Sequence, residues 1–325
     1  MLLADRERDD KMLKYVAKRL VYIVFTLWII VTCTFFMMKN LPGTPFDAER
    51  FSIMTPAQQK QVLEMYGLND PLPVQYVKYM KNMIHGDLGT SFTYVNKDVA
   101  DVVSGRLGPS ALIGIQAVLL GLAVGLILGI LAAWKHNSGI DYFTMILAVL
   151  GVSVPNFVAA ALLQYFIGLK WGILPVGFWT NWDCSVLPSI ALSFSATAMV
   201  ARFMRTEMLD VLDQDYIVTA RAKGISQMKV LMRHAVRNSV LPVVTILGPV
   251  VVNLMTGSLA VENIFSIPGI GSLFVDCIKA NDYPVIMGIT IFYAAFYMLV
   301  VLLIDLVYSV IDPRIRLAKG KEDES

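Results

Sequence analysis

Long apolar runs without charges alternate with short polar segments along most of the chain. Six runs approach or exceed the ~20 residues that a helix needs to cross a bilayer. They cover residues 20–38, 111–134, 142–169, 186–201, 239–261 and 284–304. Their lengths predict an all-α polytopic membrane protein with six transmembrane helices.

A longer polar segment, 40–108, separates the first apolar run from the other five. Thr55 before Pro56 predicts a helix start with Thr55 as the N-cap, and residues 74–83 predict a second short helix. The segment is too short for a large core of its own, so we expect a helical extracellular insert that packs on the membrane part. The predicted organisation is an N-terminal segment at 1–19, a first helix at 20–39, this insert at 40–108, a five-helix core at 109–311 with a charged loop at 205–238, and a tail at 312–325.

The composition agrees with a membrane protein and excludes other classes. Hydrophobic residues make up 56% of the 325 residues and charged residues only 16%, whereas a soluble domain has about a quarter charged residues. A net charge of +2 gives no reason to expect a nucleic-acid partner. The cysteines Cys33, Cys184 and Cys277 are far apart, so no metal site or disulfide framework is expected.

The basic residues predict an orientation. With six spans and the N-terminus inside, 17 of the 27 Lys and Arg residues fall on the inner side, and the two short outer loops hold only Lys170 and Lys279. The long insert, counted from Lys39, adds seven more, but long loops count little in the positive-inside rule. Both termini and the charged loop are therefore expected in the cytoplasm, and the insert outside.

The charged loop has the features of a short helix that ends at a glycine. Three acids come first and two bases last: Asp210, Asp213 and Asp215, then Arg221 and Lys223. This order complements a helix dipole. Gly224 suits a left-handed C-cap, and Ser226 can cap a second helix that leads into the next apolar run.

The residues of this loop resemble a known family. The pattern Asp-Tyr-x-x-Thr-Ala-Arg-Ala-Lys-Gly at 215–224, with His234-Ala-x-Arg-Asn238 and Leu241-Pro242 after it, resembles the B-type permease of oligopeptide and dipeptide ABC importers. Gly-Leu-Asn-Asp-Pro-Leu-Pro-Val-Gln-Tyr at 67–76 is similar to the same family. Where the wider superfamily often has glutamate, this chain has Val218.

The resemblance implies a permease of the type I ABC importer kind that carries oligopeptides or dipeptides and is not an enzyme. It implies a second, C-type permease, two ATPase subunits that bind ATP and Mg²⁺, and an external substrate-binding protein, at the bacterial cytoplasmic membrane. No cofactor is expected in this chain, and Gly320-Lys321 before Glu322 is no phosphate-binding loop. Two alternatives stay open: an importer of nickel or another small solute, and a proton-driven secondary transporter.

By the same resemblance, segment 215–224 docks on an ATPase subunit and couples transport to hydrolysis. The coupling residues would be Asp215, Tyr216, Thr219, Ala220, Arg221, Ala222, Lys223 and Gly224. We expect Tyr216 to be an aromatic anchor and Ala220 to allow close approach.

Polar residues inside the apolar runs have two open interpretations. The amides of Gln116, Asn156, Gln164 and Asn253 could line a peptide path or form interhelical hydrogen bonds. Asp305, an acid within an apolar run, is expected to pair with Arg202 or Arg205 near the cytoplasmic end.

Glycine and proline positions predict three further features. Gly121, Gly125 and Gly129 recur every four residues, which predicts close helix packing. Pro155 should kink the third run. The segment with Pro268, Gly269 and Gly271 resembles the outer gate region of the family, where glycine would let the backbone turn sharply.

Overall fold

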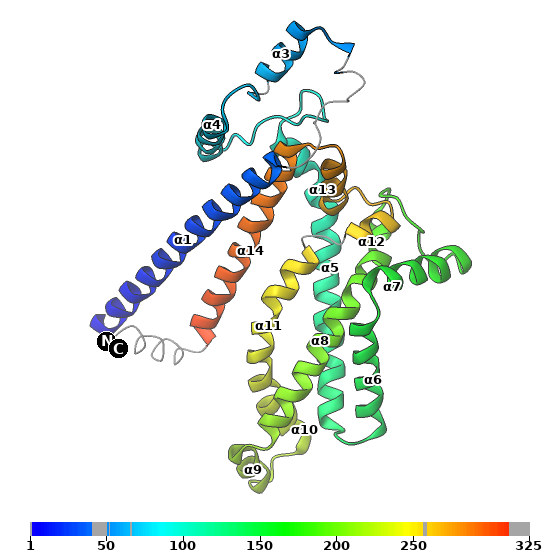
Figure 1. The fold of residues 1–325 in the computed structure, drawn as a ribbon. Coiled ribbons are helices and arrows are strands. Elements are labelled where there is room, and N and C mark those ends of the chain that lie inside the picture. The colour runs from blue at the N-terminus through cyan, green and yellow to red at the C-terminus, as the bar shows by residue number, and fades with distance from the viewer. Residues whose placement is uncertain (1, 41–50, 52, 66, 256–258, 312–325) are drawn as a thin grey trace. The chain divides into compact units, whose positions relative to one another are not determined.

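The computed structural model describes residues 2–40, 51, 53–65, 67–255 and 259–311 (Figure 1). The elements in these ranges are helices and no strand occurs among them, so the predicted all-α class is confirmed. The chain forms two compact units, residues 1–107 with 273–298 and residues 108–272 with 299–325.

Within the described ranges, four helices are long and apolar enough to cross a membrane. They are Val16–Lys39, Val99–Trp134, Trp182–Leu212 and Tyr283–Ile304. Two bent pairs raise the number to six if each pair is one span: Gly139–Ser153 with Asn156–Lys170, and Gln227–Val244 with Gly248–Ile264. The predicted six spans therefore require that both bent pairs cross the membrane.

The first unit contains the insert. It comprises α1 (Leu2–Lys39), α3 (Pro56–Met65), α4 (Leu72–Ile84), the start of α5 (Val99–Trp134), and most of α13 (Ile270–Lys279) and α14 (Tyr283–Ile311). The start of α3 is confirmed, because Thr55 N–H donates to Gln58 Oε1 at 2.9 Å and Gln58 N–H donates to Thr55 Oγ1 at 3.4 Å. This reciprocal pair is a capping box.

The insert packs on apolar helices of its own unit, as expected. Val31 and Phe35 of α1 form a buried cluster with Met287 of α14, and Tyr76 and Tyr79 of α4 pack against it. Apolar burial of this kind is the main force that holds a short helix in place.

Two helices begin earlier than their apolar runs predicted. α1 begins at Leu2 rather than at residue 20, and α5 begins at Val99 rather than at residue 111. Hydropathy marks where a helix meets apolar surroundings, whereas helical hydrogen bonding also continues through polar residues such as Arg106.

The second unit is built around α8 (Val186–Leu212), which packs against α6 (Gly139–Ser153), α7 (Asn156–Leu163) and α11 (Arg237–Met255). α5 approaches α8 through Gly121, Gly125 and Gly129. A Cβ built on each of these glycines would lie 2.6–2.7 Å from an atom of α8. The predicted close packing is confirmed, because only a residue without a side chain fits there.

The third apolar run changes direction much more than a kink. α6 ends at Ser153, and the helix from Asn156 leaves at 101° to it. Val154 and Pro155 are both extended, with ψ of 119° and 138°. Proline disfavours helical backbone in the residue before it and has no N–H to donate, so two consecutive residues leave the helix.

Candidate functional site

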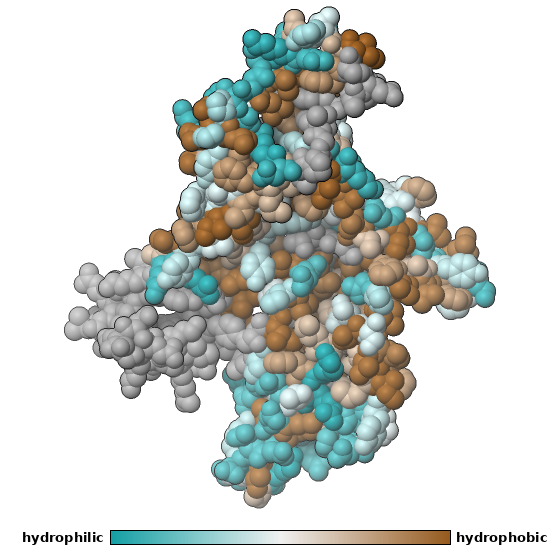
Figure 2. All heavy atoms as spheres, in the orientation of Figure 1, coloured by the Kyte–Doolittle hydropathy of each residue, from teal (hydrophilic) through white to brown (hydrophobic). Residues whose placement is uncertain are grey.

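The charged loop folds as predicted into a helix, a break and a second helix. α9 (Asp215–Ala222) is followed by α10 (Gln227–Val230), which continues through a π-helical turn (Leu231–Val236) into α11. Figure 2 shows hydrophilic residues gathered at the end of the second unit where Figure 1 places α9 and α10. The loop therefore lies at a polar end of this unit, where another protein can reach it.

The break is a complete C-cap. Gly224 has a φ of +77°, the left-handed conformation that the sequence predicted. Its N–H donates to the Arg221 carbonyl at 2.9 Å, and the Ile225 N–H donates to the Ala220 carbonyl at 3.3 Å. These two bonds form a Schellman motif, which satisfies carbonyl groups left over at the helix end.

The inner face of α9 is buried in an apolar cluster. Ile217, Ala220 and Val230 form the cluster, and Val211, Leu212 and Ile225 pack against it. The expectation that Ala220 allows close approach of a partner is wrong, because Ala220 is 7% exposed and faces this cluster. Ile217 and Ala220 share a face because residues three apart are neighbours on a helix.

The outer face of α9 carries most of the other predicted coupling residues. The exposed residues of α9 are Asp215, Tyr216, Val218, Thr219, Arg221 and Ala222, and the next two residues, Lys223 and Gly224, are also exposed. Val218 is 58% exposed, and Ala222 lies one turn further on the same face. The Tyr216 hydroxyl accepts a hydrogen bond from Asn238 Nδ2 at 2.9 Å, which ties α9 to α11.

The predicted dipole arrangement holds only in part. Asp215 lies in the first turn of α9 and Arg221 in its last turn, as expected. Asp210 and Asp213 do not belong to α9: Asp210 lies within α8, and Asp213 is the C-cap of α8. Acidic side chains at the C-terminal end of a helix oppose its dipole, so these two acids add nothing favourable to α8.

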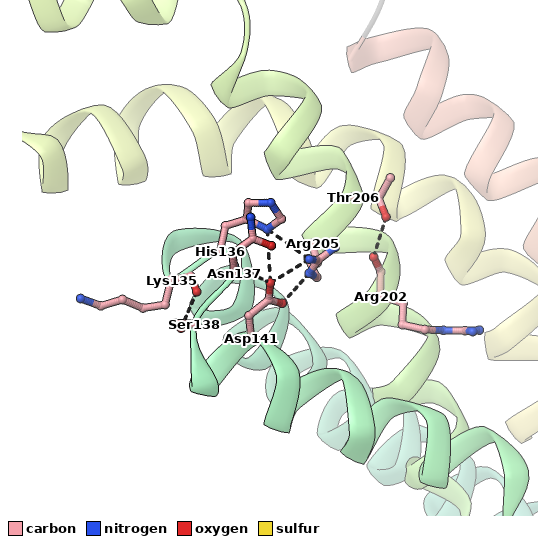
Figure 3. Close-up of polar contacts among 8 residues, drawn as sticks. All are labelled: Lys135, His136, Asn137, Ser138, Asp141, Arg202, Arg205 and Thr206. Carbon is pink, nitrogen blue, oxygen red and sulfur yellow. Dashed lines mark hydrogen bonds and ion pairs between the residues drawn. The ribbon is translucent and has the colours of Figure 1, made fainter.

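An ion pair between buried Asp141 and half-buried Arg205, which sequence analysis missed, joins α6 to α8 (Figure 3). The Asp141 carboxylate accepts hydrogen bonds from Arg205 Nε at 2.6 Å and Arg205 Nη2 at 2.8 Å. It also accepts the Asn137 N–H at 3.0 Å. His136 Nδ1 lies 3.2 Å from both Asp141 Oδ2 and Arg205 Nη2. A two-pronged pair of this kind fixes geometry as well as charge.

The expected pairing of Asp305 with Arg202 or Arg205 stays a prediction, because the Asp305 side chain lies outside the described residues. Arg205 itself binds Asp141. The available signal was Asp141 itself, an acid at the entrance of an uncharged run. Only the fold shows that α6 begins beside Arg205.

Two of the four amides in the apolar runs have helix partners. Gln116 Oε1 accepts from Ser189 Oγ on α8 at 2.8 Å. Gln164 Nε2 donates to the carbonyl of Ile264 in α12 (Leu259–Ile264) at 2.7 Å. These bonds agree with the interhelical interpretation for the two glutamines. Asn253 is exposed on α11 and Asn156 is half-buried, so their part in a path stays a prediction.

A buried carboxylate organises the segment predicted as the outer gate. Glu262 is 2% exposed. Its Oε1 accepts from Ser110 Oγ at 2.7 Å, and its Oε2 accepts from the Ser272 N–H at 2.9 Å. Ser110 Oγ in turn accepts the Ile270 N–H at 2.8 Å. Ile270 and Ser272 lie in the first turn of α13, so the carboxylate acts as a distant N-cap for this helix.

The glycines of this segment serve a different purpose from the predicted one. Gly269 and Gly271 are absent from the positive-φ glycines of the described chain, so a left-handed backbone conformation is not the reason for glycine here. A Cβ at Gly269 would lie 2.4 Å from Glu262 Oε2, and one at Gly271 would lie 3.0 Å from the same atom. The glycines leave the space that the Glu262 carboxylate occupies.

Comparison with known proteins identifies close relatives. Residues 125–317 match the family described as "Binding-protein-dependent transport system inner membrane component", and residues 12–101 match its N-terminal counterpart. The chain is 44% identical to the dipeptide transport system permease DppB of Lactococcus lactis, over 94% of this chain and 100% of that protein. It is 39% identical to the oligopeptide transport system permease OppB of Escherichia coli, again over 94% of this chain and 100% of that protein.

Solved structures show the same fold at low identity. A chain of the MetNI methionine ABC transporter matches with a TM-score of 0.54 at 12% identity, over 65% of this chain and 96% of that one. An amino acid ABC transporter matches with a TM-score of 0.53 at 15% identity, over 65% of this chain and 95% of that one. At this level of identity the matches show the fold alone.

Proposed function

This chain belongs to the family of binding-protein-dependent transport system inner membrane components, and we propose that it forms part of the translocation path of an ATP-driven importer of dipeptides or oligopeptides. The observation that carries the substrate class is the identity of 39–44% to permeases named for dipeptide and oligopeptide transport, over nearly the whole chain. The ATP would be bound and hydrolysed by separate ATPase subunits, and this chain would catalyse no reaction.

The outer face of α9 is the proposed docking surface for an ATPase subunit. Tyr216, Val218 and Ala222 supply exposed apolar area, and Arg221 supplies charge. A helix of eight residues is marginal alone, but here the buried Ile217 and the Gly224 cap hold it in shape. A preformed helix loses less conformational entropy on binding than a flexible loop.

The buried side of α9 supplies the mechanical link. Ile217 packs on Val211 and Leu212 at the end of α8, and the Tyr216–Asn238 bond reaches α11. A push on α9 would therefore move α8 and α11 together. The Asp141–Arg205 pair would pass this movement from α8 to α6, because separation would leave the buried Asp141 carboxylate without its two-pronged partner.

The remaining partners follow from family membership. They are a second permease subunit, two ATPase subunits with ATP and Mg²⁺, and a substrate-binding protein on the outer side. In this arrangement both termini and α9 face the cytoplasm, and the insert faces outward. Alternating access would arise as the ATPase subunits close and pull on α9.

Transport by the complete, reconstituted assembly tests the proposal. Proteoliposomes that contain the chain and its partners should take up a labelled dipeptide or a labelled longer peptide in an ATP-dependent manner, and should not take up nickel. Uptake of nickel with no uptake of either peptide would assign the chain to the small-solute alternative. Peptide uptake driven by a proton gradient without ATP would assign it to secondary transport.

A further inference from the structure

One helix of the insert exposes apolar side chains beside a membrane span. On α4 the exposed stripe consists of Val74, Val77, Lys81 and Ile84, at the i, i+3, i+7 and i+10 spacing of one helix face. Val77 is 63% exposed and Ile84 is 76% exposed. Apolar side chains grouped on one face of a short helix mark a contact surface more often than scattered single ones do.

The opposite face of α4 packs on α1 within its candidate membrane span, Val16–Lys39. The Tyr76 hydroxyl accepts a hydrogen bond from Trp28 Nε1 at 3.1 Å and lies 2.8 Å from Thr32 Oγ1. The Tyr76 ring also stacks on Phe36. Trp28 lies 11 residues before Lys39, which is about 16 Å along a helix. α4 is therefore held against the outer half of the apolar part of α1.

Polar residues border the stripe on one side. Lys78 and Asn82 are exposed there, and Lys78 Nζ binds Asp70 Oδ2 at 2.6 Å. Lys81 lies within the stripe, and its aliphatic stem can follow apolar surface while its ammonium reaches the headgroups. α4 therefore has one face packed on a span, one exposed apolar face and one polar face. A helix at the boundary between acyl chains and headgroups requires such an arrangement.

We propose that α4 is an interfacial helix, and that the partner of its Val74–Val77–Ile84 stripe is the outer leaflet of the bilayer. Continuity with the span selects lipid as the occupant, because Trp28 and Phe36 of α1 contact Tyr76 of α4 and are themselves 46% and 43% exposed. The insert is then anchored to the membrane surface rather than held in solution above it. The inference does not depend on the transported substrate.

Site-specific fluorescence in lipid tests this placement. In the full chain with Cys33→Ala, Cys184→Ala and Cys277→Ala, single cysteines would replace Val77 or Ile84 on the stripe. Matched controls would replace Lys78 or Asn82, which lie one and two positions away on the polar side. Each variant would carry bimane and be reconstituted into nanodiscs. The quenchers would be a phospholipid with a nitroxide at acyl carbon 5, and aqueous iodide.

The two quenchers give opposite expectations for the two faces. The nitroxide lipid should quench Val77→Cys and Ile84→Cys at least about twofold more than the controls, and iodide should show the reverse order. Equal quenching of all four positions by iodide would place the stripe in water and overturn the proposal. Protection of Val77→Cys and Ile84→Cys from both quenchers would mean that protein covers the stripe, which would also overturn it.

Discussion

At the scale of single residues, glycine is required in this protein for two different physical reasons. Gly224 is required by its backbone conformation, with a φ of +77°. Gly125 and Gly269 have ordinary backbone but no room for a side chain, since a Cβ would lie 2.7 Å from Val200 Cβ and 2.4 Å from the Glu262 carboxylate, respectively. Substitutions at these positions therefore have different physical consequences.

Gly125→Leu should separate α5 from α8 and reduce the yield of folded protein. Overpacking by a single side chain typically costs about 1–3 kcal/mol, and here the added atoms meet the backbone carbonyl of Thr197 as well as Val200. The measurement is the yield of monodisperse protein and its thermal unfolding midpoint. Gly108→Leu is the control, because it lies in the same helix with nothing within 4 Å of its Cβ. Equal behaviour of the two variants would contradict close packing at Gly125.

Gly269→Ala should impair transport by displacing the Glu262 carboxylate, and Gly269→Val should impair it more. The test is a double-mutant cycle on transport rate. In a Glu262→Ala background the added methyl no longer meets a carboxylate, so Gly269→Ala should cause little further loss. Strictly additive effects would show that the two residues act independently. Gly139→Ala, with open space around its Cβ, should leave the rate unchanged.

At the scale of elements, α9 combines a rigid inner side with an exposed outer side. Its fold is secured by Ile217, by the Gly224 cap and by the Tyr216–Asn238 bond, which leaves Val218 and Ala222 on the surface. Substitution of Ala220 would disturb the internal cluster, so it would not separate docking from folding. Val218 offers the cleaner test.

Val218→Arg should weaken binding of the ATPase subunit by about tenfold or more, equivalent to about 1.4 kcal/mol. The reason is that bulk and charge would enter the apolar part of the docking face, while insertion and folding stay normal. Pull-down of the ATPase and substrate-stimulated ATP hydrolysis of the reconstituted complex measure the effect. Gln227→Arg adds the same charge at the exposed start of α10 and should bind normally. Full association of Val218→Arg would remove this face from the coupling role.

At the scale of the whole molecule, the proposed orientation places the insert outside and α9 inside. Exposed single cysteines can test it, because an impermeant thiol reagent reaches only one side. In intact cells Lys60→Cys and Lys97→Cys should react, while Ala222→Cys and Gly320→Cys should not; residue 320 lies outside the described ranges. Labelling of Ala222→Cys without permeabilisation would reverse the orientation.

Native Cys277 should not react with the thiol reagent even when it is present. It is buried, and burial raises the pKa of its thiol to about 12. A thiol with this pKa holds almost no reactive thiolate at the pH of labelling. Removal of Cys277 should therefore leave the background labelling at pH 8 unchanged, which mass spectrometry of the labelled native protein can check.

Local patterns in the sequence by themselves determined the helical class, the apolar runs, the Thr55 cap and the Gly224 cap. Each depends on residues within one or two helical turns, so the necessary information is contiguous. The glycine repeat of α5 also predicted close packing, because small residues on one helix face allow a second helix to approach closely.

Tertiary structure decided what lies opposite each of these features. The sequence does not show which side of α9 is buried, so Ala220 was assigned to the wrong face. The pairing of Asp141 with Arg205 joins residues 64 apart, and the bond of Glu262 with Ser110 joins residues 152 apart. The partner of a polar group depends on how the helices pack, and one local pattern is compatible with many packings.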